Sequence, residues 1–293
     1  AVRIASPGGL RGAGVLRPLS VCPVWPEGRG ILLARPLLQT RRADLQAYLR
    51  DRGQSWIDDP SNEDQRYGRP RMRAKLAALS ESNPGLIPRL AAIGDKLSAE
   101  QAAIEAEALG LLEAHLKFDR FGAGRLDPAP LRGAPRDVRA AALSFAIMAV
   151  SGEAHAPALA AMPGLWARLE AKTCAVTLGG ARIGRLGARF GHQLLLTRDP
   201  GAAAGRVAPQ PDLVLQSGQT SVFDGRFEMS TGTELAGPVR IRALGPVAAK
   251  GVNLPERLKA ALKDAPAHAR AALPAIYFEE GSNSATPPFF LHG

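Results

Sequence analysis

The spacing of apolar residues changes once along this chain, and that change constrains the fold more than any other feature. Between about residues 85 and 170, apolar side chains recur every three or four positions, as in Leu86, Leu90 and Ile93, which is the period of an amphipathic helix. After residue 172 the period becomes two, as in residues 239–242, which is typical of half-buried strands. A helical part and a β-rich part in one chain predict an α+β fold.

The first eighty residues predict a strand followed by helices. Residues 31–34 form a short apolar run that favours a buried strand. Thr40 can cap a helix from Arg41 to about Arg52, and Pro70 is placed to begin another helix. A strand followed by a helix in this way belongs to an α/β layer.

Turn residues place a hairpin near the far end of the chain. Asp224 and Gly225 separate two short strand-like segments within residues 221–229. Asp-Gly tolerates the positive φ angles of a tight primed turn, so we expect a β-hairpin here.

Composition excludes several classes of protein. The 293 residues are 46% hydrophobic and 22% charged, which is typical of a globular protein, and no apolar run is long enough for a membrane span. Cys22 and Cys174 are the two cysteines, too few for a metal framework and far apart in sequence. We therefore expect no metal site, no structural disulfide, no membrane association and a cytoplasmic location.

Positive charge is concentrated at the start of the chain. The net charge is +10, and residues 1–80 hold 14 basic side chains, of which 13 are Arg, against 7 acidic ones. Guanidinium groups bind phosphate through a planar fork, so this region favours contact with a polyanion such as a nucleic acid. A high-GC genome that prefers arginine codons predicts the same excess, and both interpretations stay open.

One block of residues carries a family resemblance. It runs from Arg35-Pro36-Leu37-Leu38 through a helix to Trp56-Ile57-Asp58-Asp59-Pro60-Ser61-Asn62, and ends in Arg69-Pro70-Arg71-Met72-Arg73. This succession resembles the tRNA(Ile)-lysidine synthetase family, in which the same pieces follow in the same order. Weaker similarity to alphaproteobacterial members includes Thr197-Arg198-Asp199 and Phe223-Asp224-Gly225-Arg226.

The resemblance implies a two-step ligation. ATP, with Mg expected from the family, adenylates the C2 oxygen of the wobble cytidine in an isoleucine tRNA with a CAU anticodon. The ε-amine of L-lysine then attacks C2, and AMP leaves. Such a reaction depends on positioning and on cationic stabilisation rather than on a protein nucleophile. The resemblance leaves a homodimer open.

The chain departs from the family pattern in one respect. The family binds ATP with Ser-Gly-Gly-x-Asp-Ser after a first strand, and Ser6-Pro7-Gly8-Gly9 is a poor match because neither the strand nor the Asp-Ser is present. We therefore expect a fragment that lacks the ATP loop and is inactive alone. We expect this fragment to have three parts. Residues 1–79 form the C-terminal part of a Rossmann-like N-type ATP-pyrophosphatase domain. Residues 80–170 form a helical domain, and residues 171–293 form a mixed β-rich region.

The resemblance also nominates site residues. Arg69 and Arg73, four positions apart at the start of the helix that contains Pro70, are the candidate catalytic residues. A solvated basic face is the competing interpretation for this pair. Candidate substrate-binding residues fall in the same block: Arg35, Asp59, Asn62 and Arg71. Asp59 and Asn62 could instead only hold a turn together, and Asp58 is expected to be a solvated neighbour.

Two other functions compete with the ligase. The chain could be a non-catalytic tRNA-binding module, from a degenerate or split gene. It could also be a thiolation enzyme of the same ATP-loop superfamily, although such enzymes commonly need catalytic cysteines, and the spacing of Cys22 and Cys174 does not fit them.

Overall fold

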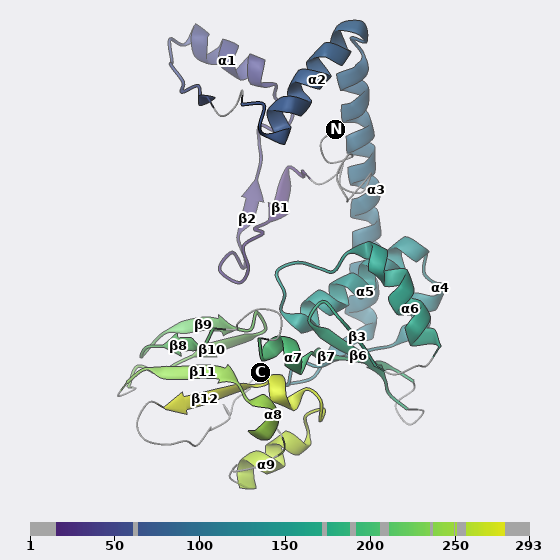
Figure 1. The fold of residues 1–293 in the computed structure, drawn as a ribbon, viewed down its shortest axis with the longest axis vertical. Helices are drawn as coiled ribbons and strands as arrows, with labels where there is room; N and C mark the ends of the chain where they lie inside the picture. The colour runs from purple at the N-terminus through teal and green to yellow at the C-terminus, as the bar shows by residue number, and fades with distance from the viewer. Residues whose placement is uncertain are drawn as a thin grey trace. The chain divides into compact units, whose positions relative to one another are not determined.

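A computed structural model describes residues 16–60, 64–171, 175–187, 192–205, 211–234, 237–248, 250 and 256–278 (Figure 1). The chain divides into two compact units. Ala1–Pro23 and Gly28–Ile104 form the first, and Val24–Glu27 and Glu105–Gly293 form the second. Helices and antiparallel sheets both occur, which confirms the α+β class.

The first unit contains one small sheet and mostly helical segments. Its elements are β1 (Leu19–Val21), β2 (Leu32–Ala34), α1 (Arg42–Asp51), α2 (Gly68–Ser82) and the first part of α3 (Leu86–His115). The predicted helix over residues 41–52 is confirmed, with Arg41 rather than Thr40 at its N-cap. Helix α2 begins two residues before Pro70.

The prediction that residues 31–34 form a buried strand was wrong about burial. Strand β2 pairs antiparallel with β1 in a two-stranded sheet, and Leu32 is 61% exposed. A two-stranded ribbon shields neither of its faces, which explains the exposure. Within the described residues, the buried hydrophobic core begins only at Ala108, in the second unit.

The second unit is built on a five-stranded antiparallel sheet in the order β3-β4-β7-β6-β5. The strands are β3 (Leu116–Phe118), β4 (Gly124–Leu126), β5 (Val176–Leu178), β6 (Ala181–Arg185) and β7 (Leu194–Arg198). Strands β3 and β4 interrupt the segment predicted as helical, because three-residue strands are too short to change the apolar period. They join in one sheet two parts of the chain that the sequence assigned to different regions.

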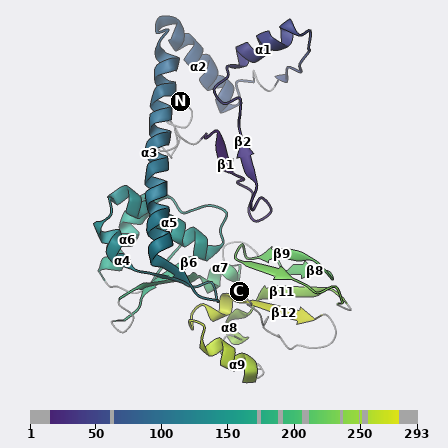
Figure 2. The same ribbon diagram turned by 180° about the vertical axis from the view of Figure 1, so that it is seen from behind.

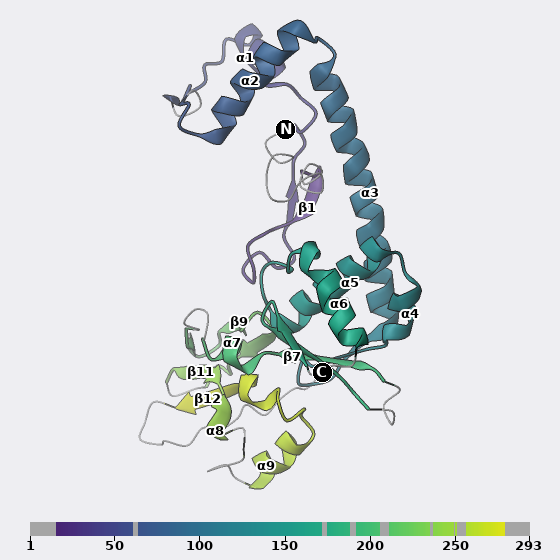
Figure 3. The ribbon, with the colours of Figure 1, turned by 45° about the vertical axis from the view of Figure 1, so that its right-hand side comes forward.

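Helices cover one face of this sheet. They are α4 (Pro128–Gly133), α5 (Arg136–Ser151), the 3₁₀ turn η3 (Leu159–Ala161) and α6 (Met162–Glu170). Figures 1 and 3 both show α5 and α6 on the same side of the strands. Leu143 and Ile147 of α5 are fully buried, as are Leu194 and Leu196 of β7, so the core lies between these layers.

A second β-rich layer follows in the same unit (Figure 2). It comprises α7 (Pro200–Ala203), β8 (Leu213–Leu215), β9 (Thr220–Phe223), β10 (Phe227–Ser230), β11 (Val239–Ala243), α8 (Gly245–Ala248), α9 (Glu256–Lys263), η5 (Arg270–Ala272) and β12 (Pro274–Phe278). Strands β12, β11 and β8 form one sheet, and β9 and β10 form the predicted hairpin. Asp224 and Gly225 have φ angles of 51° and 63°, as the Asp-Gly turn predicted. Within the described ranges, no helix is long and apolar enough to cross a bilayer.

Candidate functional site

Arg35 is tied into the β1–β2 sheet. One guanidinium nitrogen, Nη1, donates to the carbonyl oxygen of Arg17 at 3.2 Å and to the hydroxyl of Ser20 at 2.8 Å. These acceptors precede or lie within β1, so the side chain joins the end of β2 back to the neighbouring strand. It is half-buried, and this donor capacity is already used within the protein.

The loop that follows α1 is held by Asp58. Its carboxylate accepts from Arg42 Nη2 at 3.1 Å and from Trp56 Nε1 at 3.2 Å. Asp58 was expected to be merely solvated, and its role as the tie between this loop and α1 was missed. Asp59 is exposed beside it, and Asn62 lies outside the described residues.

The start of α2 carries the remaining candidates. Arg71 Nη1 donates to the carbonyl oxygens of Gln65 and Arg66, at 3.0 and 2.7 Å, so Arg71 closes the turn that leads into the helix. Arg73 is exposed two positions further on. The backbone of Arg69 belongs to α2, and its side chain lies outside the described set.

The electrostatics of this segment favour an anion. The first turn of α2 contains no acidic residue, and a helix N-terminus attracts negative charge. Before the helix, Arg66 donates to Asp64 and lowers the pKa of that carboxyl, while Asp64 raises the pKa of Arg66. Of the described candidates on α2, Arg71 is bonded to the backbone of the preceding turn, and Arg73 is an exposed cation that an anion could reach.

The described contacts do not bring the candidates to one shared point. Arg35 bonds to β1, Arg71 to the turn before α2, and the loop of Asp59 is held through Asp58. Within the described ranges, no group of three or more His, Cys, Asp or Glu side chains could hold a metal ion. Cys174 lies outside those ranges. The described residues thus supply single cations rather than a complete cradle for ATP and Mg.

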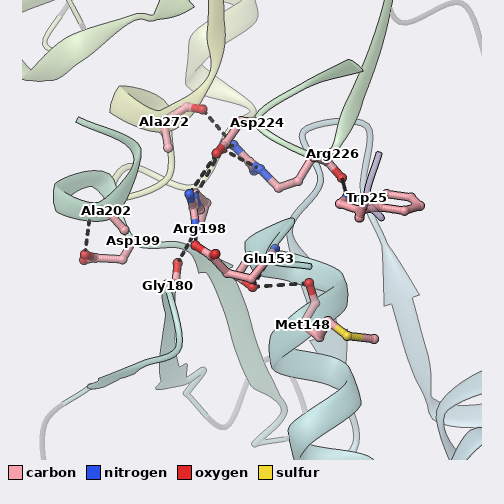
Figure 4. Close-up of polar contacts among 12 residues, drawn as sticks. Trp25, Met148, Glu153, Gly180, Arg198, Asp199, Ala202, Asp224, Arg226 and Ala272 are labelled. Atoms are coloured by element: carbon pink, nitrogen blue, oxygen red, sulfur yellow. Dashed lines mark hydrogen bonds and ion pairs between the residues drawn. The ribbon is translucent and has the colours of Figure 1, made fainter. Parts of the chain in front are cut away.

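A second polar cluster, which the sequence analysis did not nominate, lies buried in the second unit (Figure 4). Asp224, in the β9–β10 turn, accepts from Arg198 of β7 and from Arg226. These three side chains are 2%, 4% and 5% exposed. Burial lowers the pKa of Arg226, an effect opposed by Asp224. The family resemblance includes the segments that carry this cluster, but the sequence alone does not show that these side chains meet.

The cluster joins several elements of the second unit. Arg198 also donates to Glu153 after α5, at 2.9 Å, and Arg226 donates to the carbonyl of Ala272 in η5, at 2.8 Å. Trp25 Nε1 donates to the carbonyl of Gly225 at 3.2 Å. Because its charges are paired and enclosed, the cluster serves as a structural junction rather than as a site for a ligand.

Comparison with known proteins finds one matching family profile and several similar bacterial proteins. A family profile described as a PP-loop domain matches residues 9–79. The chain is 32% identical over 260 residues to a tRNA(Ile)-lysidine synthase of Caulobacter vibrioides, covering 88% of this chain and 53% of that protein. It is 34% identical over 177 residues to the enzyme of that name from Hyphomonas neptunium, covering 60% and 46% respectively. A Bradyrhizobium relative of the same name is 35% identical over 213 residues, covering 69% and 57%.

These matches include only part of each relative. The chain spans about half the length of the curated relatives it matches. The PP-loop match contains the whole Arg35–Arg73 block, whereas the 260-residue alignment with the Caulobacter relative extends far beyond it into the second unit.

Proposed function

Since this chain belongs to the tRNA(Ile)-lysidine synthase family, we propose that it forms part of an ATP-dependent ligase that modifies an isoleucine tRNA. The substrates are ATP, L-lysine and a tRNA with a CAU anticodon. The C2 oxygen of the wobble cytidine attacks the α-phosphate of ATP and releases pyrophosphate. The lysine ε-amine then attacks C2, AMP departs with the C2 oxygen, and lysidine remains after loss of a proton.

The observation that carries this proposal is the ordered block from Arg35 to Arg73 within the PP-loop match. We assign Arg73, together with Arg69 four positions before it, to the negative charge that develops on phosphate and base. An exposed guanidinium, here in the second turn of α2, can stabilise such charge without forming a covalent bond. Asp59 is our candidate acceptor for the lysine ammonium, with Asn62 in the same loop. Arg35 and Arg71 remain candidate substrate-binding residues, each fixed in place by bonds to nearby parts of the protein.

The exposed apolar residues of the first unit support a larger domain. Val21 and Ile57 are 69% and 93% exposed, and the first unit adds nothing to the described hydrophobic core. A soluble domain normally buries such side chains against a further layer. We propose that residues 1–79 are part of a Rossmann-like PP-loop domain, completed by the portion of the relatives' length that this chain does not span.

Lysine transfer tests the assignment. Radiolabelled lysine, ATP and a CAU-anticodon tRNA transcript are incubated with a protein of the relatives' full length that carries these 293 residues. Label in the tRNA, absent when the wobble cytidine is replaced by uridine, supports the proposal. We expect no transfer from the 293 residues alone. Absence of transfer from the longer protein, when it is folded and binds the tRNA, would support the non-catalytic module instead.

A further inference from the structure

The loop that follows α1 turns back along that helix. The chain reverses at Gly53, whose φ of 61° is in the left-handed region, and the N–H groups of Gly53 and of the next residue donate to carbonyls in the last turn of α1. Arg42, the first residue of α1, is bonded to Asp58, 16 positions further on. Because the ten residues of α1 span about 15 Å, the segment from Gly53 to Asp58 runs back over most of the length of the helix.

Polar bonds rather than burial hold the middle of this loop. Trp56 is half-buried, but Ile57 is 93% exposed and the side chain of Asp58 is 71% exposed. Both carboxylate oxygens of Asp58 accept a hydrogen bond, Oδ1 from Arg42 Nη2 at 3.1 Å and Oδ2 from Trp56 Nε1 at 3.2 Å. One side chain thus joins the loop both to the start of α1 and to the indole two positions before it.

The start of α2 is held by a different set of bonds. Arg71 closes the turn before this helix through two backbone carbonyls, and Arg66 pairs with Asp64 at 2.7 Å. Neither printed bond of Asp58 involves these residues. A change at Asp58 should therefore affect the loop that carries the candidate lysine acceptor without displacing Arg73.

We propose that Asp58 is a positioning residue for lysine. With Arg42 and Trp56, it fixes the loop so that the carboxylate of Asp59, the next residue, meets the lysine ammonium at one place. Lysine as the ligand of Asp59 comes from the proposed function, on which this role of Asp58 rests. A loop that samples several arrangements binds its ligand more weakly, in proportion to the fraction of molecules in the competent arrangement. Saturating lysine restores that fraction, so loss of the tie should raise KM for lysine and leave kcat nearly unchanged.

Steady-state kinetics of lysine transfer test this role, in a protein of the relatives' full length that carries these 293 residues. Asp58→Ala should raise KM for lysine about two- to fivefold, the range expected when one exposed tie is removed, and should leave kcat and KM for ATP nearly unchanged. Arg42→Ala should give a similar rise. The double variant should show no further rise beyond the larger single effect, because Arg42 acts through Asp58.

Two further variants separate the tie from local charge. Arg42→Lys keeps a cation that can bond to Asp58, so it should recover most of the affinity for lysine that Arg42→Ala loses. Asp44→Ala removes another exposed carboxylate, from the first turn of α1, and should leave KM for lysine unchanged. An unaltered KM for lysine in Asp58→Ala would overturn the positioning role. Equal rises in KM for lysine and for ATP would also overturn it, because general damage to the domain gives that result.

Hydrogen exchange distinguishes positioning from direct contact with lysine. Without substrates, the backbone amides of residues 54–59 should exchange faster in Asp58→Ala than in the unchanged full-length protein, since the loop loses its tie to α1. A higher KM for lysine with unaltered exchange would mean that Asp58 meets lysine itself, and would overturn the positioning role. Absence of lysine transfer from the unchanged, folded protein would count against both this role and the proposed function. Transfer with a KM that Asp58→Ala leaves unaltered would remove this role alone.

Discussion

The carboxylate of Asp224 accepts two hydrogen bonds from the guanidinium of Arg198, from Nη2 to Oδ1 at 2.8 Å and from Nε to Oδ2 at 3.2 Å. Charge-assisted bidentate pairs of this kind are among the stronger interactions in proteins. Arg226 donates to the same carboxylate, through Nη2 at 2.8 Å and through Nε at 3.0 Å. One buried carboxylate is therefore shared by two buried cations, and Arg198 also pairs with the half-exposed carboxylate of Glu153.

Replacement of Asp224 by Asn should strongly destabilise the second unit. The amide keeps the size of the side chain but removes the negative charge, and two guanidinium groups would remain buried without it. Breaking a buried ion pair from one side costs about 3–5 kcal/mol. Urea denaturation, followed by circular dichroism, measures the difference.

Asp264→Asn is the matched control for this prediction. Asp264 also pairs with an arginine, Arg120, but their side chains are 64% and 56% exposed. Exposed pairs contribute about 0–1 kcal/mol. If Asp224→Asn lowered the free energy of unfolding no more than Asp264→Asn does, the junction would not be what holds the unit together.

Gly225→Ala should also destabilise the protein, because two costs coincide at this position. Its φ of 63° disfavours any Cβ, by roughly 1–2 kcal/mol. An added Cβ would in addition lie within 2.1 Å of the carbonyl oxygen of Gly152, a backbone atom that cannot move aside freely.

Gly218→Ala separates the two costs. Gly218 has a φ of 71°, yet the first atom that an added Cβ would meet is a methyl carbon of Thr233, at 3.6 Å. It should therefore show only the conformational cost, and Gly225→Ala should unfold at a clearly lower temperature. If Gly225→Ala and Gly218→Ala lowered the unfolding temperature equally, the close approach of Gly152 and Gly225 would relax without an energetic cost.

Local features of the chain were predictable, and distant pairings were not. The hairpin at residues 221–229 followed from Asp224-Gly225 alone, because turn geometry depends on adjacent residues. The bond between Arg198 and Asp224 joins residues 26 positions apart in sequence, and no periodicity encodes that packing. Exposure of Leu32 was missed for a similar reason, since burial depends on which layers cover a strand.

The candidate site shows the same division. The sequence identified the block from Arg35 to Arg73, but not which of its arginines bond to the protein's own backbone. Arg71 and Arg35 do so because carbonyls of nearby turns and strands lie within their reach, a result of folded geometry. Nothing in the spacing of these residues separates them from Arg73.

His268 should make stability depend on pH. Burial lowers the pKa of His268 below its usual value of 6.5, and the charge of Arg182 lowers it further. The folded state therefore favours the neutral imidazole. This contribution is complete above about pH 6.5 and is lost as the pH falls through the lower pKa of the folded state.

The pH dependence can be assigned by substitution. His268→Gln keeps a polar side chain of similar length without a group that titrates in this range. Unfolding temperatures measured between pH 5 and 8 should fall less steeply on the acid side for His268→Gln than for the unchanged chain. Parallel curves would place the acid sensitivity elsewhere.

Arg71 and Arg73 should separate stability from activity, because they lie two positions apart on α2 with different surroundings. Arg71→Gln removes a donor to the carbonyls of Gln65 and Arg66, so it should lower the unfolding temperature. Arg73→Gln removes an exposed cation and should leave the unfolding temperature nearly unchanged. In a protein of the relatives' full length, Arg73→Gln should slow lysine transfer on the order of 10²-fold, the usual effect of removing one group that stabilises developing charge.

An unchanged rate of lysine transfer in Arg73→Gln would leave a solvated basic face as the better interpretation of this part of α2. If Arg73→Gln lost both lysine transfer and its folded structure, Arg73 would instead have a structural role. Measuring the transfer rate and the unfolding temperature on one preparation distinguishes these outcomes.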